Sequence, residues 1–167
     1  MKLKILKRFV WFAAIAMVVV SCMTDDIDDY TPPTLEEELS TLTDYIDTLE
    51  NRGLNVESTE MGVYYIIDSI GEGEYPVEGD TCRVKYTGFF LSGEIFDSSE
   101  DNTFDVALGE QTVIAGWEDG LKVFKKNAKG YLIIPSEFAY GSNGFASIPP
   151  YTTLIFNIEM VDIKRGY

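Results

Sequence analysis

Five segments rich in β-branched and aromatic residues constrain the fold of this chain more than any other feature. Residues of this kind suit the pleated, half-buried surface of a strand. The segments are residues 63–67, 82–90, 104–108, 130–135 and 152–163. Between the third and the fourth, residues 115–124 leave room for one short helix. Many strands and a single short helix predict an α+β domain, built on an antiparallel sheet, over residues 61–167.

A separate amphipathic helix is predicted over residues 34–52, with a linker up to residue 60. Thr34 fits a helix N-cap, because Glu37 follows three residues later as in a capping box, and Gly53 suits the position just past the helix end. One face is apolar at spacings of three and four residues: Leu35, Leu39, Leu42, Ile46 and Leu49. We expect this face to pack on the chain's own domain. The alternative is a homodimer that pairs through residues 34–52.

The beginning of the chain has the pattern of an export signal. Four basic residues within positions 2–8 precede an unbroken apolar run of 12 residues, at positions 9–20, and Cys22 follows. A membrane-spanning helix needs about 20 apolar residues, whereas a signal peptide needs about 7–15. The pattern resembles a bacterial lipoprotein signal. It predicts a signal peptide at residues 1–21, lipidation of Cys22, an acidic tether over 22–33, and attachment to the outer membrane on its periplasmic or surface face. The alternative is an uncleaved anchor with an unmodified cysteine.

The composition excludes several classes of function. The chain has 13 basic and 28 acidic residues, a formal net charge of -15, which excludes nucleic-acid binding through a basic surface. It has no histidine, so His-based acid–base chemistry, Ser–His and Cys–His pairs and His-containing zinc sites are excluded. The two cysteines, Cys22 and Cys82, are too few for a disulfide framework or a Cys-rich metal cluster. Cys82 is expected to be a small buried hydrophobic residue.

Several short motifs within residues 61–165 follow one another in a known order. They are Val-Lys-Tyr-Thr-Gly at 84–88, Phe-Asp-Ser-Ser at 96–99, Val-Ile-Ala-Gly-Trp-Glu-Asp-Gly at 113–120, Ala-Tyr-Gly at 139–141, Ile-Pro-Pro at 148–150 and Leu-Ile-Phe at 154–156. In this order and spacing the sequence resembles the FKBP-type peptidyl-prolyl cis-trans isomerases. The resemblance implies a curved antiparallel sheet, a half-barrel, wrapped around one short α-helix.

The resemblance also implies a pocket. Five residues would act in catalysis: Asp97, Tyr140, Phe96, Trp117 and Ile114. Six more would bind substrate: Tyr86, Phe104, Val113, Ile148, Phe156 and Phe145. The sequence departs from the best-known members at 100–103, which is short and lacks their basic residue, and at Phe145, where histidine is common. We therefore expect Asp97 to rely on Tyr86 and Tyr140.

The function implied by the resemblance is peptidyl-prolyl cis-trans isomerase (rotamase) activity that assists the folding of exported proteins. Twisting an amide makes no new bond to carbon, so the reaction needs no nucleophile, metal or cofactor, which suits a chain without histidine. The expected partners are prolyl-containing polypeptides, a macrolide of the kind this family binds, and a membrane through the lipid anchor. Two alternatives stay open: a non-catalytic module or chaperone that binds proline-containing segments, and an interaction subunit that acts through the acidic helix.

Overall fold

The computed structural model describes residues 31–166. These residues form one compact unit. The predicted signal peptide, Cys22 and residues 23–30 of the predicted tether lie outside the described residues. Among the helices that the structure describes, none is both long and apolar enough to cross a bilayer.

The predicted N-terminal helix is confirmed as α1 (Leu35–Asn51). Its capping box is complete: the Thr34 hydroxyl accepts from the Glu37 amide at 3.3 Å, and the Glu37 carboxylate accepts from the Thr34 amide at 2.8 Å. At the other end Gly53 takes a φ of +84°, which lets the Leu54 amide donate back to the Leu49 carbonyl at 3.2 Å. Local sequence therefore fixes both ends of this helix.

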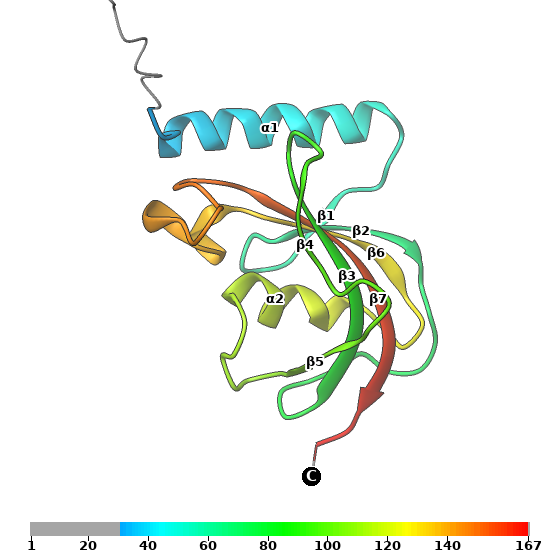
Figure 1. Ribbon diagram of the computed structural model, residues 1–167. Helices are drawn as coiled ribbons and strands as arrows, with labels where there is room; N and C mark the ends of the chain where they lie inside the picture. The colour runs from blue at the N-terminus through cyan, green and yellow to red at the C-terminus, as the bar shows by residue number, and fades with distance from the viewer. Residues whose placement is uncertain (1–30, 167) are drawn as a thin grey trace, which may run out of the picture. The chain divides into compact units, whose positions relative to one another are not determined.

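A seven-stranded antiparallel sheet forms the body of the described residues (Figure 1). Its order is β1-β2-β6-β7-β3-β4, and β5 also pairs with β3. The strands are β1 (Glu57–Ser58), β2 (Tyr64–Ser69), β3 (Thr81–Phe90), β4 (Ile95–Ser98), β5 (Phe104–Ala107), β6 (Lys129–Ile134) and β7 (Leu154–Lys164). The five predicted strands are all present. β1 and β4 were not predicted, because β1 has only two residues and β4 (Ile-Phe-Asp-Ser) ends in two polar residues that favour turns.

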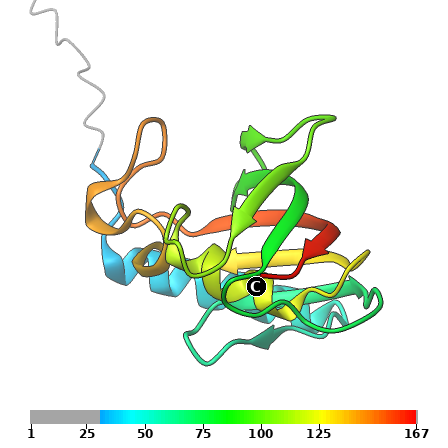
Figure 2. The same ribbon diagram turned by 90° about the horizontal axis from the view of Figure 1, so that it is seen from below.

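The predicted short helix is α2 (Ala115–Gly120), continued by a 3-10 turn, η1 (Leu121–Val123). Figures 1 and 2 show α2 lying in the concave face of the curved sheet. Gly116 and Gly120 permit this close approach, because a side chain on either would collide with Ile134 or Leu132 of β6. The main hydrophobic core fills the space between the sheet and α2. The predicted half-barrel around one short helix is confirmed.

Helix α1 packs on the opposite face of the sheet from α2. Leu42 and Leu49 are buried there against Ile66, Ile133 and Ile155 in a second core cluster. Side chains alternate between the two faces of a strand, so β6 contributes Leu132 and Ile134 to one core and Ile133 to the other. The predicted packing of the apolar stripe on the chain's own domain is confirmed for its second half. Leu35 and Leu39 stay about half exposed.

A buried carboxylate fastens α1 to the segment between β6 and β7. Glu38 is 5% exposed and accepts three hydrogen bonds. They come from the Ser136 amide at 2.7 Å, the Ser136 hydroxyl at 2.5 Å and the Thr153 hydroxyl at 2.8 Å. These donors satisfy the carboxylate, which offsets the cost of burying its charge. Glu38 thereby holds both ends of the long segment 136–153 against the helix.

Candidate active site

A cavity of about 180 Å³ lies between α2 and the strands that curve around it. Residues from β3, β4, β5, α2 and its preceding turn, the 136–153 segment and β7 line it. They are Tyr86, Phe96, Asp97, Phe104, Thr112, Val113, Ile114, Trp117, Tyr140 and Phe156. Nine of these ten residues are among the predicted site residues, so the fold brings together side chains spread over 71 positions of sequence, from 86 to 156.

Aromatic rings packed edge to face form most of the wall. Trp117 is 4% exposed. The Tyr86 ring meets it at a centroid distance of 5.0 Å and 89°, and the Phe156 ring does so at 5.1 Å and 88°. Phe96 in turn meets Phe156 at 5.5 Å and 85°. Edge-to-face contacts of this kind stabilise aromatic clusters beyond the area they bury. The result is a mostly apolar cavity with the indole of Trp117 in its wall.

Gly88 makes room for this cluster. A side chain at Gly88 would collide with the ring of Phe96. Gly88 pairs with Asp97 across the β3–β4 ladder, so the missing side chain leaves space for the Phe96 ring to lie over the strand. The glycine that ends the Val-Lys-Tyr-Thr-Gly motif is therefore explained by packing beside the cavity.

Asp97 supplies the charged group of the cavity. The Tyr86 hydroxyl donates to Asp97 Oδ2 at 2.8 Å, and the Ser98 amide donates to Oδ1 at 2.8 Å. Burial, followed by this hydrogen bond to Asp97, raises the pKa of Tyr86, so its phenol stays protonated and remains a donor. The expected reliance of Asp97 on Tyr86 is thus present as a hydrogen bond. Tyr140 makes no such bond within residues 31–166; burial and the nearby Asp97 charge raise its pKa.

Several residues that line the cavity carry unpaired hydrogen-bond donors. One is the buried indole Nε1 of Trp117, which has no partner within the described residues. Among residues 31–166, neither the Ile114 amide nor the Tyr140 hydroxyl donates to a protein acceptor. Apolar walls with a few unpaired polar groups are typical of a site that binds a small apolar ring next to amide carbonyls. Cys82 is not part of this site: it is fully buried in the core, and burial raises the pKa of its thiol to about 12.

Two predicted substrate-binding residues do not line the cavity. Ile148 is buried in the main core cluster. Phe145 is 62% exposed, and its ring stacks on Tyr140 at a centroid distance of 5.1 Å and 14°. Phe145 therefore covers one face of the Tyr140 ring from outside. The remaining lining residue, Thr112, was missed, although it immediately precedes the 113–120 motif.

The comparisons with known proteins agree with this geometry. Residues 72–161 match the family described as FKBP-type peptidyl-prolyl cis-trans isomerase. A "Probable FKBP-type peptidyl-prolyl cis-trans isomerase" of Haemophilus influenzae is 41% identical over 114 residues, which cover 68% of this chain and 47% of that protein. FkpA of Escherichia coli, an FKBP-type peptidyl-prolyl cis-trans isomerase, is 39% identical over 115 residues, which cover 69% of this chain and 42% of that protein. The chain spans about half the length of the curated relatives it matches.

Solved structures share the fold. The crystal structure of FkpA from Escherichia coli superimposes with a TM-score of 0.65 and 34% identity, covering 78% of this chain and 62% of that one. A peptidyl-prolyl cis-trans isomerase from Pseudomonas syringae gives a TM-score of 0.70 and 28% identity, covering 81% of this chain and all of that one (100%). With its motifs, its aromatic cavity and more than half of its length matched, the chain belongs to the FKBP-type peptidyl-prolyl cis-trans isomerase family.

Proposed function

We propose that this chain catalyses the cis–trans isomerisation of X–Pro peptide bonds in polypeptides. The observation that carries the proposal is the 180 Å³ aromatic cavity around Trp117, which is of a size to take a pyrrolidine ring. The cavity is apolar, and two donors, the Ile114 amide and the Tyr140 hydroxyl, adjoin it.

The reaction is a rotation about the X–Pro peptide bond, in which no covalent bond is made or broken. Rotation about a peptide bond faces a barrier of about 18–20 kcal/mol, because the planar amide must lose its resonance. A twisted amide has a less polarised carbonyl than a planar one. An apolar cavity therefore stabilises the twisted form relative to the planar form, which is the differential binding that lowers a barrier. Proton transfer has no part in this mechanism.

We assign distinct roles to the residues in and around the cavity. The Ile114 amide and the Tyr140 hydroxyl would hold substrate carbonyls on either side of the prolyl ring. The Tyr86–Asp97 pair would keep its charge fixed at the edge of the cavity, since Tyr86 and the Ser98 amide both donate to the carboxylate. Phe145 would act through Tyr140, because its stacked ring limits how far the Tyr140 ring can turn. Ile148 would support the wall from the core.

A protease-free exchange assay by NMR tests the proposal on a Leu-Pro tetrapeptide. Uncatalysed isomerisation takes about 10–100 s at 25 °C, so a sub-stoichiometric amount of protein should speed exchange clearly. Tyr140→Phe and Trp117→Ala variants that remain folded should lower the rate. Tight binding of the peptide without any acceleration would instead support the alternative of a non-catalytic binding module or chaperone.

We further propose that the protein acts on exported polypeptides from the outer membrane, anchored by a lipid on Cys22. The support is the sequence alone: a short apolar run, then Cys22, then an acidic segment. Growth with labelled palmitate should tag the protein and fail to tag a Cys22→Ser variant. A macrolide ligand for the cavity and a homodimer through residues 34–52 also remain proposals, tested by calorimetry and by analytical ultracentrifugation.

A further inference from the structure

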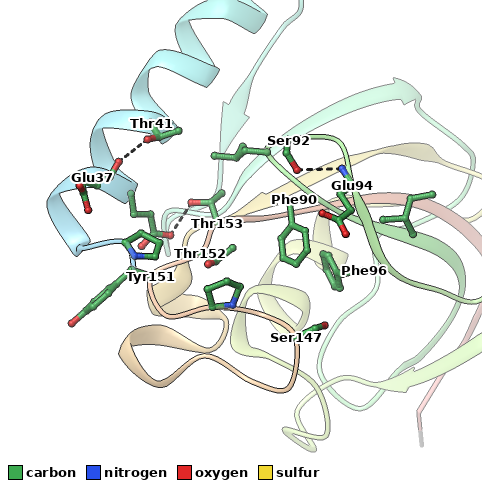
Figure 3. A pocket seen from close by; sticks show the side chains of 15 residues that line it. Glu37, Thr41, Phe90, Ser92, Glu94, Phe96, Ser147, Tyr151, Thr152 and Thr153 are labelled. Carbon is green, nitrogen blue, oxygen red and sulfur yellow. Dashed lines mark hydrogen bonds between the residues drawn. The ribbon is translucent and has the colours of Figure 1, made fainter. Parts of the chain in front are cut away.

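A second and larger hollow lies beside the prolyl cavity. It holds about 580 Å³ and is enclosed by three elements: the first turns of α1 with Pro33, the β3–β4 hairpin, and the end of the 136–153 segment. Figure 3 shows the Phe90 and Phe96 rings on the hairpin side, with Tyr151 and the Glu37 region of α1 across from them. We refer to it as the helix–hairpin groove. No motif in the sequence indicated it.

The groove adjoins the prolyl cavity at one shared side chain. Phe96 lines both hollows. On the cavity side its ring contacts Phe156, and on the groove side it contacts Phe90 at a centroid distance of 5.1 Å. A polypeptide advances about 3.3–3.6 Å per extended residue, so residues flanking a bound proline pass from one side of this ring to the other within a few positions.

The groove has apolar walls that are open to solvent. Ile95 is a large apolar side chain, yet it is 59% exposed. Phe90, Phe96 and Pro149 extend the same apolar lining. An exposed apolar surface next to a binding cavity is typical of an interaction site.

The charges at the groove are of one sign. Its lining includes three glutamates and no basic residue. Glu38 is buried and satisfied by Ser136 and Thr153, whereas Glu37 and Glu94 are exposed at the rim. A complementary occupant therefore carries basic as well as large apolar side chains, and an acidic segment is repelled.

We infer that the helix–hairpin groove binds the part of a client polypeptide that flanks the proline, and that it selects large apolar residues accompanied by lysine or arginine. The inference rests on the proposed isomerase function, which puts the proline in the neighbouring cavity. The occupant is the substrate's own chain, because the two hollows share Phe96 as a wall and a chain leaving the cavity reaches the groove within a few residues. The acidic rim then favours basic residues in that flanking part.

The test compares KM values for three peptides with the same Leu-Pro core. One is Gly-Leu-Pro-Gly, whose glycines bring no side chain to the groove. The others are 12-residue peptides flanked by Phe, Leu and Lys, or by Phe, Leu and Glu. We expect the unmodified full chain to favour the basic 12-mer. Ile95→Ser and Glu94→Lys should raise its KM relative to that of the tetrapeptide by about tenfold, equivalent to about 1.4 kcal/mol.

Two matched substitutions away from the groove serve as controls. Ile70 is 70% exposed and Glu60 is exposed, so Ile70→Ser and Glu60→Lys should leave the KM ratio unchanged. Glu94→Lys should also weaken or reverse the preference for the basic over the acidic 12-mer.

A KM ratio that is the same in all variants overturns the inference while the isomerase function stands. No turnover of the tetrapeptide by the unmodified chain overturns the function, and the inference with it. An Ile95→Ser variant that changes oligomeric state would make the groove an interface between copies and would also overturn the inference.

Discussion

Replacing Glu38 by alanine tests whether α1 is fastened to the isomerase fold by a buried carboxylate. The substitution removes one acceptor group and leaves three donors without a partner: the Ser136 amide, the Ser136 hydroxyl and the Thr153 hydroxyl. The two hydroxyls can turn to other acceptors, but the buried amide cannot. An unsatisfied buried donor costs about 1–3 kcal/mol, so with a smaller loss at the hydroxyls we expect Glu38→Ala to lower the free energy of unfolding by about 3 kcal/mol.

Urea unfolding followed by far-UV circular dichroism measures this loss. With a slope of about 2 kcal/mol per molar urea, the midpoint should fall by about 1.5 M. Glu38→Gln keeps one carbonyl oxygen for the Ser136 amide and should lose about half as much. Glu50→Ala is the matched control, because Glu50 is an exposed glutamate of the same helix, and it should change stability by less than about 0.5 kcal/mol. A Glu38→Ala midpoint equal to that of Glu50→Ala would refute the reasoning.

Three further predictions concern the cavity and the pH dependence of stability. A folded Asp97→Asn protein should keep at least a tenth of its isomerase activity by NMR exchange, since a general acid or base contributes about 10²–10⁴-fold and none is needed here; a ten-thousandfold loss would contradict the mechanism. In a Trp11→Phe background Trp117 is the one remaining indole, and a prolyl peptide or macrolide should change its emission; an unchanged spectrum alongside calorimetric binding would put the site elsewhere. Hydrogen bonds from the Val77 and Gly166 amides, and the Arg165 guanidinium, hold the pKa of Asp80 below its ordinary value of 3.8. The stability that Asp80 contributes is therefore full above about pH 4 and is lost as the pH falls through its folded pKa, so urea midpoints of the unmodified protein and Asp80→Asn should converge in acid; a constant difference would argue against this role.

The sequence predicted those parts of the structure that depend on near neighbours. A capping box needs only residues 34 and 37, and the helix end needs only a glycine at 53, so both were readable. Five strands have a composition that marks them as strands, whereas the two residues of β1 and the Asp97-Ser98 end of β4 do not. Eight of the nine predicted lining residues sit within motifs that recur in a known family, and Phe104 lies between two of these motifs; no single residue marked the cavity.

The 136–153 segment was less predictable. Its motifs, Ala-Tyr-Gly and Ile-Pro-Pro, placed Tyr140 at the cavity but gave no orientation to Ile148 or Phe145. In the structure Ile148 turns into the core and Phe145 stacks on Tyr140 from outside. Which way a loop side chain points depends on contacts with other elements, and the loop sequence does not contain them.

The burial of Glu38 could not be predicted from the sequence. Glu36, Glu37 and Glu38 follow one another in α1, and composition does not distinguish them. The spacing of four to Leu42 places Glu38 on the buried face, which was a readable hint, but its partners lie 98 and 115 residues away. The same holds for the helix–hairpin groove, whose walls come from α1, the β3–β4 hairpin and the segment before β7.

By itself the sequence determined the periodicities, the caps, the family motifs and the absence of histidine, because these are properties of residues a few positions apart or of composition. Only the tertiary structure decided which carboxylate is buried, which rings meet and where the second groove opens, because those contacts exist only once distant segments have packed together.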